Sequence, residues 1–232
     1  MRAVIIACQT IKEELCLALK ETGVDYPVIY IESGLHNTPN VLHSRIQAQL
    51  DLLGNVDYVL LAFGFCGNSL VGIKSSAFTI VLPKADDCIP LLLGSCEARK
   101  LITQEMGTYF ATKGWLDYEK NILWEYERCI SRYGEQRALR VMKTMLGHYR
   151  RFMVIDTGAY ETDCVTPRTE EFAARLGLKH AITPGSLRLL HKLLLGQWDQ
   201  EFIVLAPGEE ISLEDVCSAG GGQVSQPGAC LG

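Results

Sequence analysis

The chain has 232 residues, of which 48% are hydrophobic and 21% are charged, and its formal net charge is -5. This composition excludes a disordered chain, and its apolar stretches fall short of the roughly 18 residues that a membrane-spanning helix requires. The negative charge argues against general nucleic-acid binding, which requires a basic face. The chain opens directly on a buried-strand pattern without a secretion signal, so we expect a cytoplasmic protein that contacts neither a membrane nor nucleic acid.

Four short apolar runs that are rich in β-branched residues predict strands in the first 90 residues, at 4–7, 28–31, 58–63 and 78–82. Residues 11–20 show helical spacing, and a second helix is expected after Thr38 and Pro39, which suit the N-cap and the first helical position. This βαβαβ order predicts a parallel sheet with right-handed crossovers, so its strands end along one edge. In open α/β sheets, ligands bind at that edge.

A metal-capable side chain follows each of the four strands. Three of them, His36, Cys66 and Cys88, would give Zn²⁺ three protein ligands and one open position, the arrangement of catalytic zinc. Cys8 would either close the coordination sphere or stand beside an open one. The alternative is that the cysteines pack as small apolar residues beside a glycine turn, and that the imidazole only caps the following helix.

The segments around the two later cysteines supply further candidates. Gly64 and Gly67 allow a tight turn and a close approach to the backbone, and with Asn68 we expect them to bind a cofactor. Asp87 either caps a helix that begins at Cys88 or acts as a catalytic base. The start of such a helix is expected to stabilise a thiolate. Further along this helix, Cys96 is expected about two turns away and outside the ligand sphere.

The rest of the chain suggests a second half. Tyr109 and Trp115 lie in a glycine-spaced loop, where their rings could line a cofactor pocket or pack in the core. Mixed charged and apolar residues predict two helices that break at Gly134, and a strand-helix rhythm then returns with strands at 152–156, 180–183 and 202–205. We therefore expect an α/β fold of two Rossmann-like parallel-sheet halves (1–114 and 151–216), a helical bridge (115–150), a flexible tail (217–232), and a site in the cleft at the strand ends.

Several motifs together resemble the domain of unknown function 1638 family. The strings that carry the resemblance are VIIAC at 4–8, GLHN at 34–37, FGFCGN at 63–68, DCI at 87–89, LGS at 93–95, GTYF at 107–110, GQWD at 196–199 and APG at 206–208. The resemblance implies an association, because members occur in anaerobic microbes, often beside corrinoid-dependent methyltransferases that act on methylated amines and related compounds.

The ligand types and the resemblance lead to one functional expectation. Zinc bound by one histidine and two cysteines resembles the site of thiol-activating methyltransferases, where soft ligands suit delivery of a substrate thiolate. We expect zinc-dependent methyl-transfer or thiol-activating chemistry in corrinoid-linked one-carbon metabolism, with a small-molecule methyl donor or thiol as substrate and a corrinoid protein or methyltransferase as partner. The alternative is a non-catalytic accessory protein that binds a corrinoid, a metal or another cofactor in the same cleft.

Overall fold

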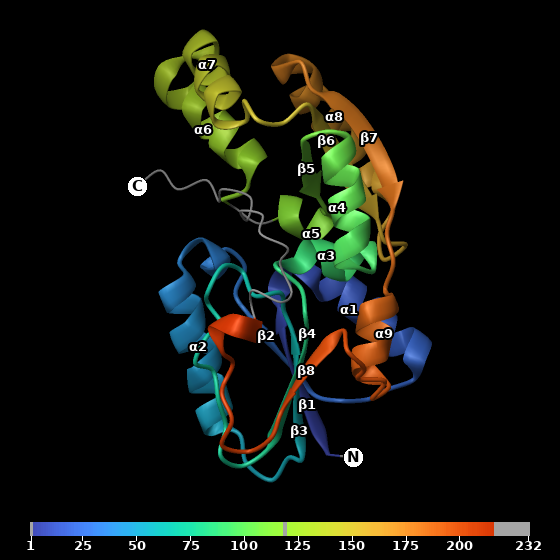
Figure 1. The fold of residues 1–232 in the computed structure, drawn as a ribbon. Helices are drawn as coiled ribbons and strands as arrows, with labels where there is room; N and C mark the ends of the chain where they lie inside the picture. Colours follow the sequence, from blue (N-terminus) through green and yellow to red (C-terminus); the bar gives the residue numbers. More distant parts are fainter. Residues whose placement is uncertain (1, 118–119, 216–232) are drawn as a thin grey trace.

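The computed structural model describes residues 2–117 and 120–215, so the predicted tail at 217–232 lies outside the described residues. The expected α/β fold is confirmed, with one mainly parallel sheet and one parallel sheet (Figure 1). The first sheet has the strand order β2-β1-β3-β4-β8, and the second has the order β5-β6-β7. The strands of the first sheet are β1 (Ala3–Cys8), β2 (Val28–Ile31), β3 (Tyr58–Ala62), β4 (Thr79–Pro83) and β8 (Phe202–Leu205). Those of the second sheet are β5 (Thr108–Ala111), β6 (Arg151–Asp156) and β7 (Lys179–Pro184).

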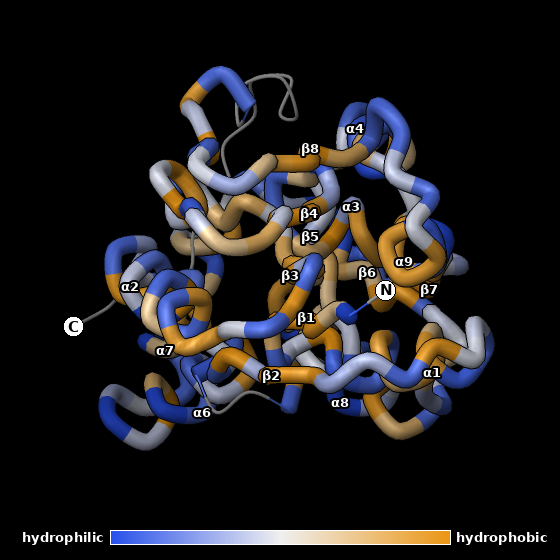
Figure 2. Tube along the Cα trace, turned by 90° about the horizontal axis from the view of Figure 1, so that it is seen from below, coloured by the Kyte–Doolittle hydropathy of each residue, from blue (hydrophilic) through white to orange (hydrophobic). Residues whose placement is uncertain are grey.

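The helices cover both faces of each sheet. They are η1 (Gln9–Ile11), α1 (Lys12–Thr22), η2 (Leu35–Asn37), α2 (Pro39–Leu52), α3 (Cys88–Leu93), α4 (Cys96–Glu105), α5 (Lys113–Leu116), α6 (Ile122–Tyr133), α7 (Glu135–Met145), η3 (Thr162–Cys164), α8 (Thr166–Leu176) and α9 (Arg188–Leu194). We call the five-stranded sheet with α1, α2 and α9 the first lobe, and the three-stranded sheet with α6, α7 and α8 the second lobe. Viewed from below, the strands of the first lobe form an apolar centre with more polar helices around it (Figure 2).

Alternation along the strands directs side chains to separate buried clusters. In the first lobe, Ile6 and Leu61 pack with α2, while Ile5 and Leu60 point to the opposite face, where α1, α3 and α9 lie. That second cluster continues into the other lobe through Met153 of β6, among other residues. One contiguous apolar cluster therefore joins the lobes.

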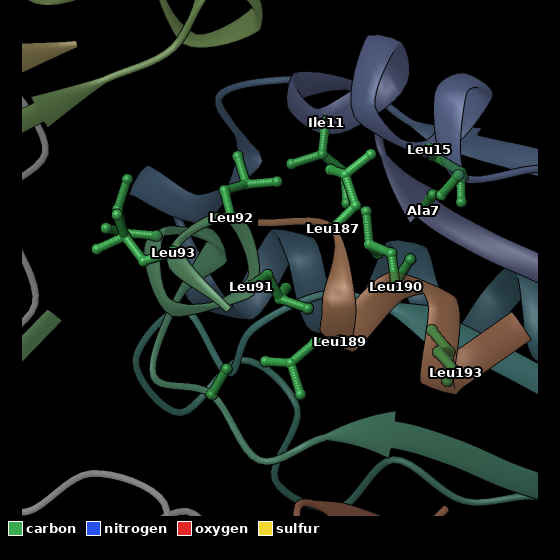
Figure 3. Close-up of a cluster of buried hydrophobic side chains, with 14 of the residues drawn as sticks. Ala7, Ile11, Leu15, Leu91, Leu92, Leu93, Leu187, Leu189, Leu190 and Leu193 are labelled. Atoms are coloured by element: carbon green, nitrogen blue, oxygen red, sulfur yellow. The ribbon is translucent and has the colours of Figure 1, made fainter. Parts of the chain in front are cut away.

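Leucines of α3 and α9 form the middle of this joining cluster (Figure 3). Leu91 and Leu92 face Leu189 and Leu190, and Ile11 closes the cluster from the side of the first strand (Figure 3). All five side chains are at most 3% exposed. At about 25 cal/mol per Å² of apolar surface removed from water, such a cluster contributes strongly to holding the lobes together.

The lobes meet at the carboxyl ends of their strands. The β5 end continues into α5, where a β-carbon at Gly114 would lie 1.9 Å from the carbonyl oxygen of Thr10, just after β1. The β7 end runs into Ser186, whose N–H donates to the carbonyl of Leu92 at the end of α3 (2.8 Å). Because these contacts involve main-chain atoms, the two sets of strand ends are fixed face to face.

Four features differ from the sequence-based expectations. Phe202–Leu205 pairs antiparallel with β4 of the first sheet, so its expected place among the strands of the second half is wrong. The glycine-spaced segment at 107–115 contains β5, a buried strand that pairs with β6, rather than only a loop. Helices α6 and α7 pack on the second sheet with α8, so the segment expected as a bridge forms a layer of the second lobe. Gly94 ends α3 and Ser95 caps α4, so Cys96 begins a separate helix.

Candidate functional site

Three cysteines lie at the ends of neighbouring strands, and we call Cys8, Cys66 and Cys88 the thiol edge. Cys8 is the last residue of β1, Cys66 lies in the loop after β3, and Cys88 begins the helix after β4. Because β3 lies between β1 and β4 in a parallel sheet, these three ends are adjacent. The sequence-based prediction that strand ends would bring these cysteines to one edge is confirmed.

The loops after β3 and β4 are joined by their main chains. Phe65 donates its N–H to the carbonyl of Ala85, and Cys66 donates to the carbonyl of Asp86, both at 2.8 Å. A β-carbon at Gly64 would lie 2.3 Å from the Cα of Asp87. The group that approaches Gly64 closely is therefore the backbone of the neighbouring loop, which explains this glycine without a cofactor.

Cys66 has a left-handed backbone, with φ of 46°, and Gly67 follows with φ of 73°. A residue other than glycine rarely adopts this conformation, and such strain persists where the surrounding structure imposes it, often at functional sites. Asn68, the third predicted cofactor-binding residue of this loop, is exposed. The loop therefore turns its thiol inward and its amide side chain toward solvent.

Burial is the main influence on the three thiols, and it raises the pKa of each. The charge of Asp87 and the other two thiols raise the pKa of Cys88 further, which shows how closely these groups are gathered. The pKa of Cys88 is thus raised at the start of α3, contrary to the expected stabilisation of its thiolate. The Sγ of Cys8 donates a hydrogen bond to the hydroxyl of Thr10 at 3.2 Å.

Asp87 has two structural partners. Its carboxylate accepts a hydrogen bond from the N–H of Ile89 (2.8 Å), which confirms the predicted helix cap. Its other oxygen lies 2.9 Å from a guanidinium nitrogen of Arg99, and both side chains are only about one-sixth exposed (15% and 16%). Both oxygens are thus engaged, so a role as a base would require one of these contacts to break.

His36 contacts a tryptophan of α5. Its ring stacks on that of Trp115, with centroids 4.7 Å apart and an angle of 25° between the planes. Burial lowers the pKa of His36 to about 4, so the imidazole is neutral near pH 7. Trp115 in turn donates its Nε1–H to the hydroxyl of Tyr109 (3.3 Å), which is buried in β5. Trp115 thereby connects His36, a predicted metal ligand, with Tyr109, a predicted cofactor-binding residue.

Glu14 is a buried residue at this junction that the sequence analysis missed. Its side chain is 0% exposed, Oε1 accepts a hydrogen bond from the Thr157 hydroxyl after β6 (3.2 Å), and Oε2 is buried without a partner in the described residues. Burial raises the pKa of Glu14 to about 7. The negative charge of its carboxylate in turn raises the pKa of the Cys88 thiol. The signal was present in the sequence, because Glu14 shares the helical face of Ile11 and Ala18.

The predicted metal ligands share a region but do not form a ready metal cage. Among residues 2–117 and 120–215, no three His, Cys, Asp or Glu side chains lie so that they could hold a metal ion together. The donor set of three thiols and a neutral imidazole is soft and suits zinc in its chemistry. Across the same ranges, no helix combines the length and apolar character needed to cross a bilayer.

The fold and the thiol edge define an α/β protein of one mainly parallel and one parallel sheet, with ionisable groups gathered where the two lobes meet. The family described as protein of unknown function (DUF1638) matches residues 30–194, and the chain belongs to this family. The matched region contains His36, Cys66 and Cys88 and begins after Cys8. No curated protein and no solved structure matches the chain.

Proposed function

We propose that this protein binds Zn²⁺ at the thiol edge and that the metal serves thiol activation or methyl transfer. In this proposal His36, Cys66 and Cys88 are the ligands, and Cys8 is either a fourth ligand or a neighbour of an open position. The observation that carries it is the convergence of three buried thiols from three separate strand ends, close enough to shift one another's pKa.

The electrostatics of the edge support a cation. Burial, the neighbouring thiols and the carboxylates of Asp87 and Glu14 all disfavour a thiolate at Cys88. A bound divalent cation reverses this balance, because it stabilises thiolates directly and offsets the nearby negative charge. Zinc also accepts thiolate and imidazole ligands together.

The surrounding residues would have distinct roles. When bound, zinc would supply an electrophilic centre at which a substrate thiol is held as its thiolate. His36 is already neutral, the state that binds a metal, and Trp115 limits the orientation of its ring. Arg99 and the α3 cap fix Asp87 beside Cys88. These contacts would keep the ligand-bearing segments in place.

The wider setting rests on the family resemblance alone. We propose a small-molecule thiol or methyl donor as substrate, a corrinoid protein or methyltransferase as partner, and a cytoplasmic location. An accessory role without catalysis is the second candidate, in which the same cleft binds a corrinoid, a metal or another cofactor.

The experiment that tests the proposal is anaerobic purification with metal analysis and an ultraviolet-visible spectrum. A colourless protein with one zinc per chain supports thiol activation, whereas corrinoid or iron-sulfur absorption supports the accessory role. X-ray absorption on the Cys8→Ala variant then distinguishes an open site from a closed one. If the site is open, this variant keeps its zinc and gains a sulfur ligand when a small thiol is added. If Cys8 is a ligand, zinc affinity and thermal stability fall together.

A further inference from the structure

The second lobe contains a cavity of about 750 Å³ that is separate from the thiol edge. Its walls come from the end of α5, from α6, from the start of α7 and from α8. Trp124 and Phe172 line it together with aliphatic side chains. Six charged side chains surround these apolar groups, and the volume lies in the range typical of a small-molecule site.

A buried tyrosine lies beside one of the arginines of this cavity. Tyr126 is 6% exposed, and its ring packs edge-on against Phe172. Its hydroxyl interacts with Arg175, whose pKa is raised chiefly by Glu171 and Glu135 and to a smaller extent by Tyr126. Arg175 is therefore held by three groups of the protein itself.

The charges around the cavity select the sign of the ligand. Arg168 pairs with Asp117 at 3.0 Å, and Arg175 pairs with both Glu135 and Glu171. Both guanidinium groups are therefore already neutralised and are not free to bind an anion. The Glu127 carboxylate also lines the cavity, and within the described part of the chain it makes no ion pair or side-chain hydrogen bond. The lining thus has unmatched negative charge.

We propose that this cavity binds an organic ammonium compound. The apolar body of the ligand contacts Trp124 and Phe172, and its ammonium group is held near Glu127. Trp124 already attracts one cation, since the guanidinium carbon of Arg128 lies 5.2 Å from the centre of its ring. A ligand cation is attracted in the same way by an aromatic face. This inference concerns a second site and does not depend on metal binding at the thiol edge.

The test compares three probes of the same shape, benzylammonium, benzyl alcohol and benzoate, by titration at low salt with the full chain. We expect benzylammonium to bind most tightly, benzyl alcohol more weakly and benzoate least. Because an ion pair at an exposed position contributes about 0.2–1 kcal/mol, Glu127→Gln should weaken benzylammonium binding by a factor of about 1.5 to 5. The same variant should leave the affinity for benzyl alcohol unchanged.

The matched control is Glu97→Gln, which removes another exposed carboxylate, on α4 and outside the cavity lining. It should leave benzylammonium binding unchanged. Both substitutions are at exposed positions, so the fold should tolerate them. The proposal is overturned by benzoate binding as tightly as benzylammonium, by no benzylammonium binding at millimolar concentration, or by equal losses in the two variants.

Discussion

Gly64 and Asp87 lie in direct main-chain contact, and no other residue type fits at position 64 without moving one of the two loops. A β-carbon there would lie 2.3 Å from the Cα of Asp87. We therefore expect Gly64→Ala to destabilise the protein by about 1–3 kcal/mol, the usual cost of inserting a carbon into a closely packed site. Denaturant unfolding measures this change.

The control for this substitution is Gly54→Ala. An added β-carbon at Gly54 meets no atom within 4 Å, and the residue does not have a left-handed backbone. Its expected effect is between zero and a stabilisation of about 0.4–1 kcal/mol, because alanine restricts the unfolded chain. Equal stabilities of the two variants would contradict the close contact at Gly64.

Glu14 should give the stability of the protein a dependence on pH. Its pKa rises from 4.5 to about 7 on folding, so the folded state binds the proton more tightly than the unfolded state. The stabilisation is complete below pH 4.5, is lost progressively as the pH rises to about 7, and amounts to about 3 kcal/mol. Unfolding of the Glu14→Gln variant should lack this contribution.

The measurement is the difference in unfolding free energy between the unaltered protein and Glu14→Gln across pH 4.5 to 7. This difference is needed because His36 changes the unfolding free energy in the opposite direction. Its pKa is lowered on folding, so the stability that the neutral imidazole contributes is lost as the pH falls from 6.5 to 4. Glu13→Gln is the neighbouring control, since Glu13 is only partly buried and pairs with Lys113. A constant difference for Glu14→Gln would show that this carboxyl is not protonated on folding.

Asp87 should affect the thiols through its charge and the fold through its cap. Asp87→Asn keeps a side chain that can cap α3 but removes the negative charge that raises the pKa of Cys66 and Cys88. Alkylation of these cysteines by iodoacetamide in the metal-free protein should therefore begin at a lower pH. Asp87→Ala should show the same shift and an added loss of about 1 kcal/mol in stability. An unchanged alkylation profile in both variants would contradict the electrostatic role of Asp87.

Local patterns in the sequence predicted most of the fold. The strands β1 to β4 were visible because four buried, β-branched runs alternate with helical spacing, and parallel order follows from the short crossovers. The position of Phe202–Leu205 was not predictable in this way. An antiparallel edge strand can join either sheet, and the helix α9 that precedes this strand packs in the cluster beside the first sheet.

The site was predictable only as far as strand ends determine it. Topology brought Cys8, Cys66 and Cys88 together, but the contact of His36 with Trp115 depends on how the lobes meet. The contact of Gly64 with the neighbouring loop was also not predictable. In sequence, a glycine that leaves room for a ligand cannot be distinguished from one that leaves room for another loop.

The most direct test of the central claim is the zinc affinity of the metal-free protein. The protein is reloaded with zinc anaerobically under reducing conditions, and its affinity is measured by competition with a chelator. We expect one zinc per chain and a loss of affinity of about 100-fold or more in Cys66→Ala and Cys88→Ala, since even residues that only support ligands cost 10–100-fold. Cys96→Ala is the matched control, because this partly buried thiol donates to the carbonyl of Lys84. Its zinc affinity should equal that of the unaltered protein. Undiminished zinc binding by Cys66→Ala and Cys88→Ala would contradict a metal site at the thiol edge.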